Sequence, residues 1–565
     1  MKALSLNLPW LPQQSNQHAG LKRWYISTWL VAALVALPVL SVFYLALFPS
    51  ENIWAHLAET VLPHYVSTTL QLLVGVGLLS AILGISTAAL VSLCNFPGRR
   101  YFEWALLLPF AVPAYVIAYV YTDLLEFAGP VQGALRELFG WKTMRDYWFP
   151  DIRTLGGAIL MLSLVLYPYV YMLARASFLE QSNSLRDASR MLGCSAWKSF
   201  FRVTLPIARP AIAVGLSLVC METLNDFGTV DFFAVKSLSA GIYDTWLNMN
   251  NLGGAAQIAS MMMIFVVMLI TLERIGRNRQ KQYHGSDRFQ ALDTLELKGW
   301  HRWAAFATCA IPVLFGFALP VYILAGYALD NIEQLWQQDF LTHAGHSFFL
   351  STTAAVSTIV IALLLAYSKR LHKQRSLQHA VNLSSLGYAM PGAVLAIGVM
   401  IPLAAFDNTL DSWLSNSFGI STGLLLSGTT FAIIFAYSVR FLAVSTGAVD
   451  SSLSKVTPSM DMAARSLGYT PLETLFKVHL PLIRGGILTA GLVVFVDCMK
   501  ELPATLILRP FNYDTLATFV YQYASDEMLE ECSLAALLIV VVGIVPVILL
   551  SRTITATRNK RRAAH

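Results

Sequence analysis

The sequence predicts an all-α, polytopic membrane protein with about twelve transmembrane helices. Of its 565 residues, 56% are hydrophobic and 13% are charged, whereas soluble domains carry about 25% charged residues. The mean hydropathy is +0.58. Apolar runs long enough to cross a bilayer, which takes roughly 20 residues each, recur along the chain. These three observations exclude a soluble enzyme, a disordered chain and a disulfide scaffold.

The apolar runs form two sets of six, separated by a charged stretch. The first set lies near residues 25–48, 67–94, 102–125, 155–180, 209–232 and 255–274. The second set lies near residues 303–328, 347–368, 385–406, 422–446, 483–508 and 532–551. We therefore expect a first membrane half at 1–274, a cytoplasmic linker at 275–302 and a second membrane half at 303–565.

The distribution of basic residues predicts the orientation. With a cytoplasmic N-terminus, the external segments would be 49–66, 126–154, 233–254, 329–346, 407–421 and 509–531. These segments carry only six of the 39 Lys and Arg residues, and cytoplasmic segments of membrane proteins are enriched in both. We expect a multi-pass protein with both termini in the cytoplasm. The external segment 126–154, with Trp141 and Trp148, is either a docking surface for a binding protein or an interfacial aromatic cap.

The two halves resemble each other. The sequence PFAVPAYVIAY around Pro113 matches GYAMPGAVLAI around Pro391. A longer cytoplasmic match aligns without gaps, so that Gly193 pairs with Gly468 and Pro206 with Pro481, each 275 residues apart. Because each half has an even number of spans, the repeat is parallel, with a pseudo-two-fold axis along the membrane normal. This arrangement favours a pathway between the halves over a duplication without a shared pore.

The matching segment is a cytoplasmic loop between spans four and five, and again between spans ten and eleven. We expect two short helices in it. The first is capped by Ser184 and ends at Gly193 in a left-handed conformation. The second begins at Ser195 and stops before Pro206. Such a loop could lie flat on the bilayer, but its repetition at identical spacing favours a docking element.

These residues carry a resemblance to a known family. Permeases of ABC importers share the pattern E-A-A, three residues, G, nine residues, I-x-L-P. The first copy here contains Asp187, Ala188, Ser189, Gly193, Leu205 and Pro206; the second contains Met462, Ala463, Ala464, Gly468, Leu480 and Pro481. The resemblance implies a type I ABC importer permease fold, in which these loops are coupling helices that sit in clefts of the ATPase subunits.

Both copies depart from the family pattern at its leading glutamate. Asp187 stands there in the first copy and Met462 in the second. Asp461 lies one residue earlier, where it would face a different side of the helix. We therefore expect the two docking sites to be unequal.

The resemblance extends to a narrower group. The sequence VDCMKELPATLILRPF and the downstream YDTLATFVYQYASDEMLEE look like fused permeases of ferric-iron importers. This implies a transport subunit rather than an enzyme, in the inner membrane, surrounded by lipid. It also implies an ATPase dimer, a periplasmic or extracellular substrate-binding protein and one permease chain per complex. Related fused permeases carry thiamine, phosphonate or other small solutes, and these substrates stay open.

Charged residues follow each cytoplasmic loop inside the predicted spans. The repeat aligns Glu222 with Asp497, and Asp226 with Glu501; Lys500 aligns with Asn225. A charge at mid-bilayer costs roughly 2.5–3.5 kcal/mol on insertion scales, so such residues face a cavity or a partner. Gly228 and Pro503 also align, which predicts an interrupted helix in each half. The charges either line a cation pathway or form a structural ion pair of Lys500 with Glu501 or Asp497.

Other functional classes find little support in the sequence. It contains no phosphate-binding G-x-x-x-x-G-K-[ST] motif, so ATP and Mg²⁺ are expected on a separate ATPase and no cofactor on this chain. No His or carboxylate cluster has metal-ligand spacing, and the six cysteines are scattered. We expect no resident metal and no nucleic-acid partner. An ion-driven secondary transporter remains an alternative, although it does not need the duplicated coupling loop.

Overall fold

The structure confirms the all-α fold with many membrane spans. The computed structural model describes residues 14–49, 53–181, 189, 191–280, 295–333, 338–372 and 374–563. Within these residues, eleven helices are long and apolar enough to cross a membrane, and a bent helix pair brings the number to twelve. Two-residue strands, β1 (Cys94–Asn95) and β2 (Leu295–Glu296), pair in parallel where the chain enters the second half.

The first half contains the elements up to residue 280. Its helices are α1 (Gln14–Leu47), α2 (Trp54–Glu59), α3 (Leu62–Leu93), α4 (Arg99–Ala105), η1 (Leu108–Ala111), α5 (Ala114–Leu125), α6 (Pro130–Phe139), α7 (Leu155–Glu180), α9 (Ala196–Ser199), η2 (Phe200–Thr204), α10 (Leu205–Asn225), α11 (Gly228–Phe232), α12 (Leu238–Tyr243), η3 (Asp244–Asn248) and α13 (Leu252–Gln280). Half of the predicted linker, residues 281–294, lies outside the described residues.

The second half repeats this order from residue 300. Its helices are α14 (Trp300–Val313), η5 (Leu314–Ala318), α15 (Leu319–Asp330), α16 (Gln338–Leu371), α17 (Arg375–Ser384), η7 (Leu386–Ala389), α18 (Gly392–Phe418), α19 (Thr430–Leu453), α20 (Pro458–Ser466), α21 (Pro471–Thr474), η8 (Leu475–His479), α22 (Leu480–Met499), α23 (Pro503–Leu508), α24 (Leu516–Ser525) and α25 (Leu529–Ala563).

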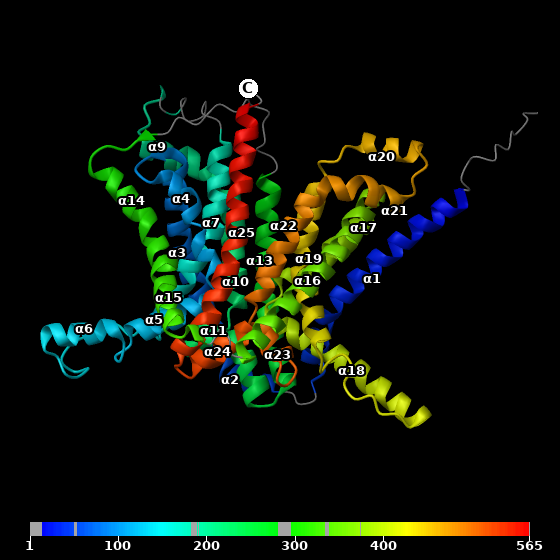
Figure 1. Ribbon diagram of the computed structural model, residues 1–565, viewed down its shortest axis with the longest axis horizontal. Helices are drawn as coiled ribbons and strands as arrows, with labels where there is room; N and C mark the ends of the chain where they lie inside the picture. The colour runs from blue at the N-terminus through cyan, green and yellow to red at the C-terminus, as the bar shows by residue number, and fades with distance from the viewer. Residues whose placement is uncertain are drawn as a thin grey trace, which may run out of the picture.

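Two hydrophobic cores hold the helices together, and each combines elements of both halves. One core is built on α3, α7 and α10 and includes α14, α15 and α25. The other is built on α16, α19 and α22 and includes α1 and α13. In Figure 1, α1 accordingly leans along α16 and α17, while α14 lies beside α3 and α15 beside α25. The first and last spans of each half therefore brace the opposite half.

The third predicted span, 102–125, is wrong as a single helix. The helical segments Arg99–Ala111 and Ala114–Phe139 meet at a bend of 89°. The cause is Pro113, whose ring disfavours a helical conformation of the preceding residue, and Val112 is accordingly extended with ψ of 124°. The matching Met390, before Pro391, is extended as well, with ψ of 126°. Figure 1 shows α6 and the end of α18 projecting from opposite sides of the bundle.

The predicted helix stop before Pro206 is also wrong. The helix runs without interruption from Ala196 to Asn225. The amide of Leu205 donates to the carbonyl of Phe200, five residues earlier, in a π-helical turn. This wider turn accommodates the proline that follows, which lacks an amide hydrogen and needs space against the preceding turn. The second half repeats the device, because Leu480 donates to Leu475 just before Pro481.

The predicted helix interruptions at Gly228 and Pro503 are confirmed. The spans end at Asn225 and Met499 rather than at 232 and 508, and the short helices α11 and α23 follow each break. In Figure 1, these short helices lie at the end of the bundle opposite α9 and α20. Both predicted coupling loops therefore lie at one end of the molecule, and both broken helices point toward the other.

Candidate translocation site and coupling loops

The two broken helices meet around a cavity of about 110 Å³. All five charged residues that the sequence predicts for the pathway line it: Glu222, Asp226, Asp497, Lys500 and Glu501. Neighbouring elements complete the wall with Phe110, Tyr115, Tyr169, Tyr388 and Arg440. The repeat thus brings together charges that are 275 residues apart in the sequence.

The helix breaks hold two of the carboxylates in place. The Asp226 carboxylate accepts hydrogen bonds from the Thr229 and Val230 amides, at 3.1 and 3.3 Å, where α11 begins. In the second half, the Glu501 carboxylate accepts from the Ala504 amide at 3.2 Å, where α23 begins. A negative charge is favourable at such free amides. The breaks therefore supply both the acidic side chains and the groups that orient them.

Both basic side chains of the cavity, Lys500 and Arg440, form ion pairs. Lys500 Nζ lies 3.0 Å from Asp497 Oδ1, as one of the two predicted pairings requires. Glu501 pairs with Arg440 instead of Lys500, at 3.2 Å, and each of these two residues is only 5% exposed. Arg440 also donates to Asn225 Oδ1 at 2.7 Å, which links the halves, because Asn225 accepts from the Gly392 amide as well.

Arg440 is the main site residue that our sequence analysis missed. It stands alone in the apolar run FAIIFAYSVRFLAV, where a charged side chain signals a buried partner or a cavity. The rule that identified Glu222 would also have found it. Tyr115, Tyr169 and Tyr388 carry no comparable signal, because tyrosines in membrane spans are common.

Glu222 differs from the other carboxylates of the cavity. Among the described residues, its side chain forms no hydrogen bond and no ion pair, although it lines the cavity. Tyr115 is 4% exposed, and its hydroxyl also has no hydrogen-bond partner within the described part of the chain. Arg440 and Lys500 attract the Glu222 carboxylate electrostatically, although each forms its ion pair with another carboxylate.

Two tyrosines at matching positions join the halves beside the cavity. The hydroxyl of Tyr243 on α12 donates to the carbonyl of Pro503 in the second half. The hydroxyl of Tyr521 on α24 donates to the carboxylate of Asp231 in the first half. Phe227 stacks on Tyr243, with ring centroids 3.6 Å apart. This contact lies on the side of the breaks away from the coupling loops.

The first coupling loop is only partly described. Asp187 and Ala188 lie outside the described residues, as does Ser184. Ser189 is buried, and its hydroxyl lies 2.6 Å from that of Ser199. Gly193 has φ of +78°, the predicted left-handed conformation, and Ser195 caps the following helix. Leu205 and Pro206 begin α10.

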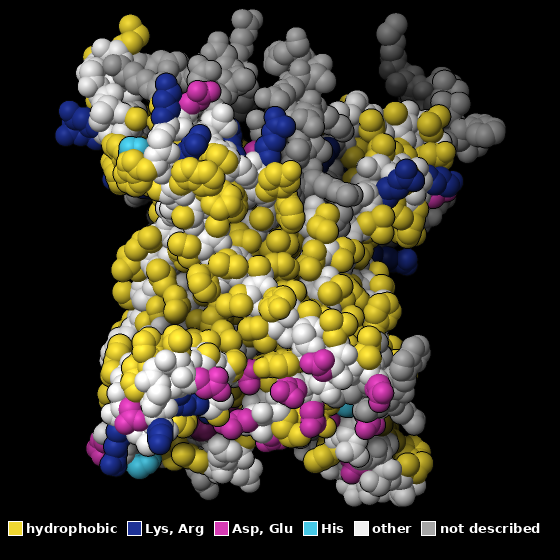
Figure 2. Space-filling model, turned by 60° about the vertical axis from the view of Figure 1, so that its left-hand side comes forward, with side chains coloured by type: hydrophobic (Ala, Val, Ile, Leu, Met, Phe, Trp, Pro, Cys, Tyr) yellow, Lys and Arg dark blue, Asp and Glu magenta, His cyan; other side chains and the backbone are white. Residues whose placement is uncertain are grey.

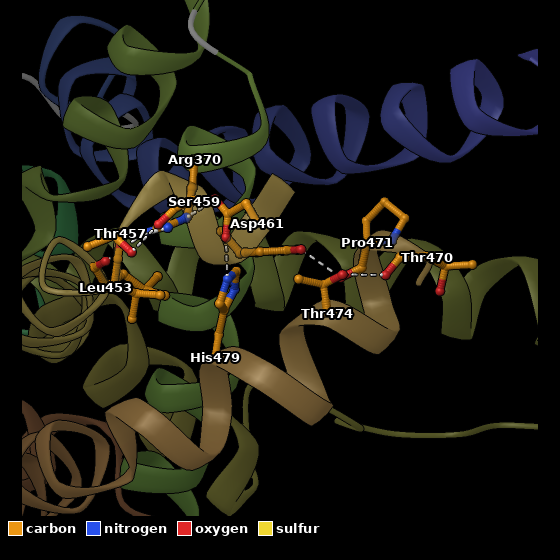
Figure 3. Close-up of polar contacts among 11 residues, drawn as sticks. Arg370, Leu453, Thr457, Ser459, Asp461, Thr470, Pro471, Thr474 and His479 are labelled. Carbon is orange, nitrogen blue, oxygen red and sulfur yellow. Dashed lines mark hydrogen bonds and ion pairs between the residues drawn. The ribbon is translucent and has the colours of Figure 1, made fainter. Parts of the chain in front are cut away.

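The second coupling loop is fully described and has a different anchor. Asp461 accepts from Arg370 Nε at 2.8 Å and contacts His479 Nε2 at 2.6 Å (Figure 3). Arg370 also donates to the Leu453 and Val456 carbonyls. The carboxylate of Asp461 therefore points into the protein, on a different side of α20 from the exposed Met462, and a different side is what its offset in the pattern predicts.

The other motif residues of the second loop face outward or form its turn. Met462 is 64% exposed, Ala463 is exposed and Ala464 is buried. Gly468 has φ of +82°, and Leu480 and Pro481 begin α22. Burial raises the pKa of the Asp461 carboxyl. The hydrogen bonds from Arg370 and His479 lower this pKa by more than burial raises it, so the pKa lies below the usual value.

The external segment 126–154 forms a compact aromatic element around α6. The Trp141 ring stacks between Phe139 and Tyr147, with centroids 4.8 and 4.7 Å away. Trp148 is 85% exposed. Both a docking surface and an interfacial cap fit this arrangement, and the choice stays a prediction.

Comparisons with known proteins agree with this architecture. The family described as "Binding-protein-dependent transport system inner membrane component" matches residues 80–281. The chain is 25% identical over 496 residues to the Fe(3+)-transport system permease protein FbpB 2 of Haemophilus influenzae, covering 86% of this chain and 89% of that protein. It is 22% identical over 555 residues to the ferric transport system permease protein FbpB of Actinobacillus pleuropneumoniae, covering 90% and 76%.

A third relative covers a smaller part of the chain. The molybdenum transport system permease protein ModB of Escherichia coli (strain K12) is 29% identical over 206 residues. The match covers 86% of that protein but 35% of this chain.

Proposed function

We propose that this chain, as a multi-pass inner membrane permease of the ABC importer family, moves ferric iron into the cytoplasm. As part of a binding-protein-dependent system, it works with a substrate-binding protein and an ATPase. The observation that carries the iron proposal is the span of the ferric relatives, which align along 86% and 90% of this chain. The molybdenum relative aligns with about a third of this chain.

The proposed transport cycle places each partner at one end of the molecule. The binding protein releases iron at the end where α11 and α23 lie, and an ATPase dimer docks on the two coupling loops. ATP and Mg²⁺ bind the ATPase, and this chain holds no cofactor and no nucleic acid. ATP-driven closure of the dimer moves the loops and switches the access of the cavity between the two sides.

Charge supports the proposed orientation. In Figure 2, Lys and Arg gather mainly at one end of the hydrophobic belt, and Asp and Glu gather at the other. Because cytoplasmic segments are rich in basic residues, the end with the coupling loops is the cytoplasmic one. The proposal therefore puts both termini in the cytoplasm and lipid around the belt, as the distribution of basic residues along the sequence predicts.

The repeat supports one chain per complex. The halves at 1–274 and 303–565, joined by the linker 275–302, supply both coupling loops and both broken helices. A single chain therefore contributes everything that a two-half permease needs around one cavity. The pathway assignment of Glu222, Asp226, Asp497, Lys500 and Glu501 rests on their shared position in its wall.

The test is uptake of radiolabelled ferric iron in iron-starved cells that contain the ATPase and the binding protein, with and without this chain. We expect uptake to require the chain and to fail when Gly193 and Gly468 are both replaced. Iron uptake that is the same without the chain would remove iron as the substrate. Thiamine, phosphonate and molybdate would then be assayed with the same strains.

A further inference from the structure

We propose that Phe511, at the tip of the turn between α23 and α24, is an anchor residue on which the substrate-binding protein docks. The inference rests on the proposed function and deepens it, because it names the contact through which that partner reaches the permease. The ring of Phe511 enters an apolar pocket on the surface of the binding protein, and displacement of its turn acts on the broken helix beside the cavity.

The position and exposure of Phe511 leave its ring free for a partner. Phe511 is 102% exposed, so no part of the described chain covers the ring. The turn lies beyond the spans, because α22 ends at Met499 and the short α23 precedes the turn. Figure 1 shows α23 and α24, which flank the turn, at the end away from α9 and α20. The ring is therefore presented at the end that the proposed orientation gives to the binding protein.

The turn is held in place by contacts within it and with α16. The Tyr513 amide donates to the Pro510 carbonyl at 3.2 Å. Arg509 and Asp514 form an ion pair across the base of the turn. The Tyr513 ring stacks on His346 of α16, with centroids 3.8 Å apart. A group that is fixed before binding loses little conformational freedom when it binds, so the turn presents its phenylalanine ready for a partner.

The first half contains the matching turn, between α11 and α12. The amides of Leu238 and Leu516, which begin α12 and α24, each donate to a hydroxyl group of a long span, α3 or α16. This match pairs Ala234 with Asn512, and both are left-handed, with φ of 53° and 58°. A residue with a Cβ adopts this conformation at a cost, although Asn tolerates it better than Ala. The repeated cost indicates that both halves need this shape of turn.

The residue before the left-handed position differs between the two turns. Phe233 is 2% exposed and belongs to a hydrophobic core, whereas Phe511 is fully exposed. The matching backbone thus buries the phenylalanine in one half and displays it in the other. A displayed ring gains nothing from folding, because its apolar surface stays in water until a partner covers it.

The surroundings of the ring favour a protein partner over lipid. Arg509 and Asp514 flank Phe511, and their side chains are 28% and 23% exposed. Charged groups are disfavoured in hydrocarbon, so we do not expect this turn to enter the bilayer. The matching family is described as dependent on a binding protein. Aromatic side chains are enriched at protein interfaces, where anchor residues fill pockets of the partner.

The turn is also connected to the cavity wall. The Arg509 amide donates to the Thr505 carbonyl of α23 at 2.9 Å. At the start of α23, the Pro503 carbonyl accepts from the Tyr243 hydroxyl of the first half. The Thr505 hydroxyl donates at 2.7 Å to the carbonyl of Glu501, which lines the cavity. Docking on the turn therefore acts on the segment that joins the halves and carries a cavity carboxylate.

The first experiment titrates purified binding protein onto the complex of this chain and its ATPase in liposomes and measures ferric-iron uptake. Phe511→Ala should raise the half-saturating concentration of binding protein at least about tenfold, with an unchanged maximal rate. Phe511→Trp, which keeps an aromatic anchor, should lie close to wild type. The matched control Phe418→Ala removes a 64% exposed phenylalanine at the end of α18 and should change neither value.

The outcomes separate docking from the proposed function. With a wild-type complex that transports iron, an unchanged half-saturating concentration in Phe511→Ala overturns the docking site and leaves the proposed function intact. A lower maximal rate at saturating binding protein, or equal losses in Phe511→Ala and Phe418→Ala, overturns the docking site as well. A wild-type complex that takes up no iron overturns the proposed function, and crosslinking then tests the docking site.

The crosslinking measurement identifies the occupant without transport. The photoreactive amino acid p-benzoylphenylalanine replaces Phe511 in the full chain, which is assembled with its ATPase in nanodiscs and illuminated with purified binding protein. We expect a product with the combined mass of the permease and the binding protein, and much less of it when the same amino acid replaces Phe418. Crosslinks to lipid or to a second copy of this chain, in place of the binding protein, would overturn the assignment.

Discussion

The described parts of the two coupling loops, from Gly193 and from Gly468 onward, adopt similar backbone conformations, but the loops are anchored by different contacts. Gly193 and Gly468 end their first helices with φ of +78° and +82°, and a capped helix follows each. In the first loop, the described anchor is the hydrogen bond between two neutral hydroxyls, those of Ser189 and Ser199. In the second, the Asp461 carboxylate joins α20 to α16 and η8.

This difference shows how a duplicated element can diverge without losing its shape. The backbone is fixed by glycine conformation and caps, which both copies retain. The side chain at the leading position is free to change, because the acid one residue earlier points inward. Arg370 ends the long span α16, so the second loop is tied directly to a membrane helix. We infer that motion of this loop is transmitted to α16.

The largest expected effect is the loss of this charged anchor. Asp461→Ala leaves His479, which is 1% exposed, without its partner and removes a charged contact of Arg370. Removing hydrogen bonds to a charged group costs about 2–3 kcal/mol, whereas Ser189→Ala in the first loop should cost about 1 kcal/mol.

Hydrogen exchange of the α20 amides in the purified protein measures the local effect of Asp461→Ala. Asp461→Asn is the matched control, because it keeps the shape and one acceptor oxygen, and it should lie between alanine and wild type. Unchanged exchange in Asp461→Ala would mean that the anchor does not hold the loop.

Acid should loosen the second loop. The folded state lowers the pKa of Asp461 below its ordinary value of 3.8, so its contribution is fully present above that value. As the pH falls below about 4 and through the folded-state pKa, protonation removes this contribution. Proteolysis of α20 should therefore accelerate in that range, more in wild type than in Asp461→Ala. The same acceleration in both proteins would contradict the assignment.

Alanine substitution of the left-handed glycine should have a similar effect in each loop. A left-handed conformation costs a residue with a Cβ roughly 1–2 kcal/mol. Nothing lies within 4 Å of a Cβ built at Gly193 or Gly468, so the cost is conformational and carries no clash. Gly193→Ala and Gly468→Ala should lower ATPase affinity by similar factors.

Gly485→Ala is the control for these glycine variants. Gly485 lies inside α22 with equal space around it, and alanine there should be neutral or stabilising. A large difference between the two loop variants would show that their backbones are not equivalent in the complex.

The sequence predicts the spans, the helix breaks and the glycine turns because these follow from apolar length and backbone chemistry. It also brings Glu222 and Asp497 to one cavity, because the repeat imposes their symmetry. It does not predict that the helix continues through Pro206, since the π-helical turn that accommodates the proline has no sequence signal. It does not predict that Arg440 pairs with Glu501 either, because that contact depends on how α19 packs against the break after α22.

Substitution of a helix-capping residue should have a smaller effect than substitution of a left-handed glycine. Ser195 accepts from the Lys198 amide, while Thr470 and Glu473 form a reciprocal capping box. Ser195→Ala should cost about 1 kcal/mol, and Thr470→Ala should cost more, because it breaks two contacts. Exchange of the first-turn amides in each helix compares them directly. A greater loss in Ser195→Ala would contradict this order.

The smallest effect is expected from Met462→Glu, which restores the family's leading acid in the second loop. Met462 is 64% exposed on α20, so glutamate fits there without disturbing Asp461. An exposed ion pair contributes about 0.5–1 kcal/mol, which corresponds to a gain of roughly two- to fivefold in affinity for the ATPase. Titration of the ATPase onto the permease in nanodiscs measures this gain, with Met460→Glu, two residues earlier on the same helix, as the control. Equal gains in both variants would reflect general charge attraction. A gain in Met462→Glu alone would show that the second loop lost a specific contact that the inward-facing Asp461 does not replace.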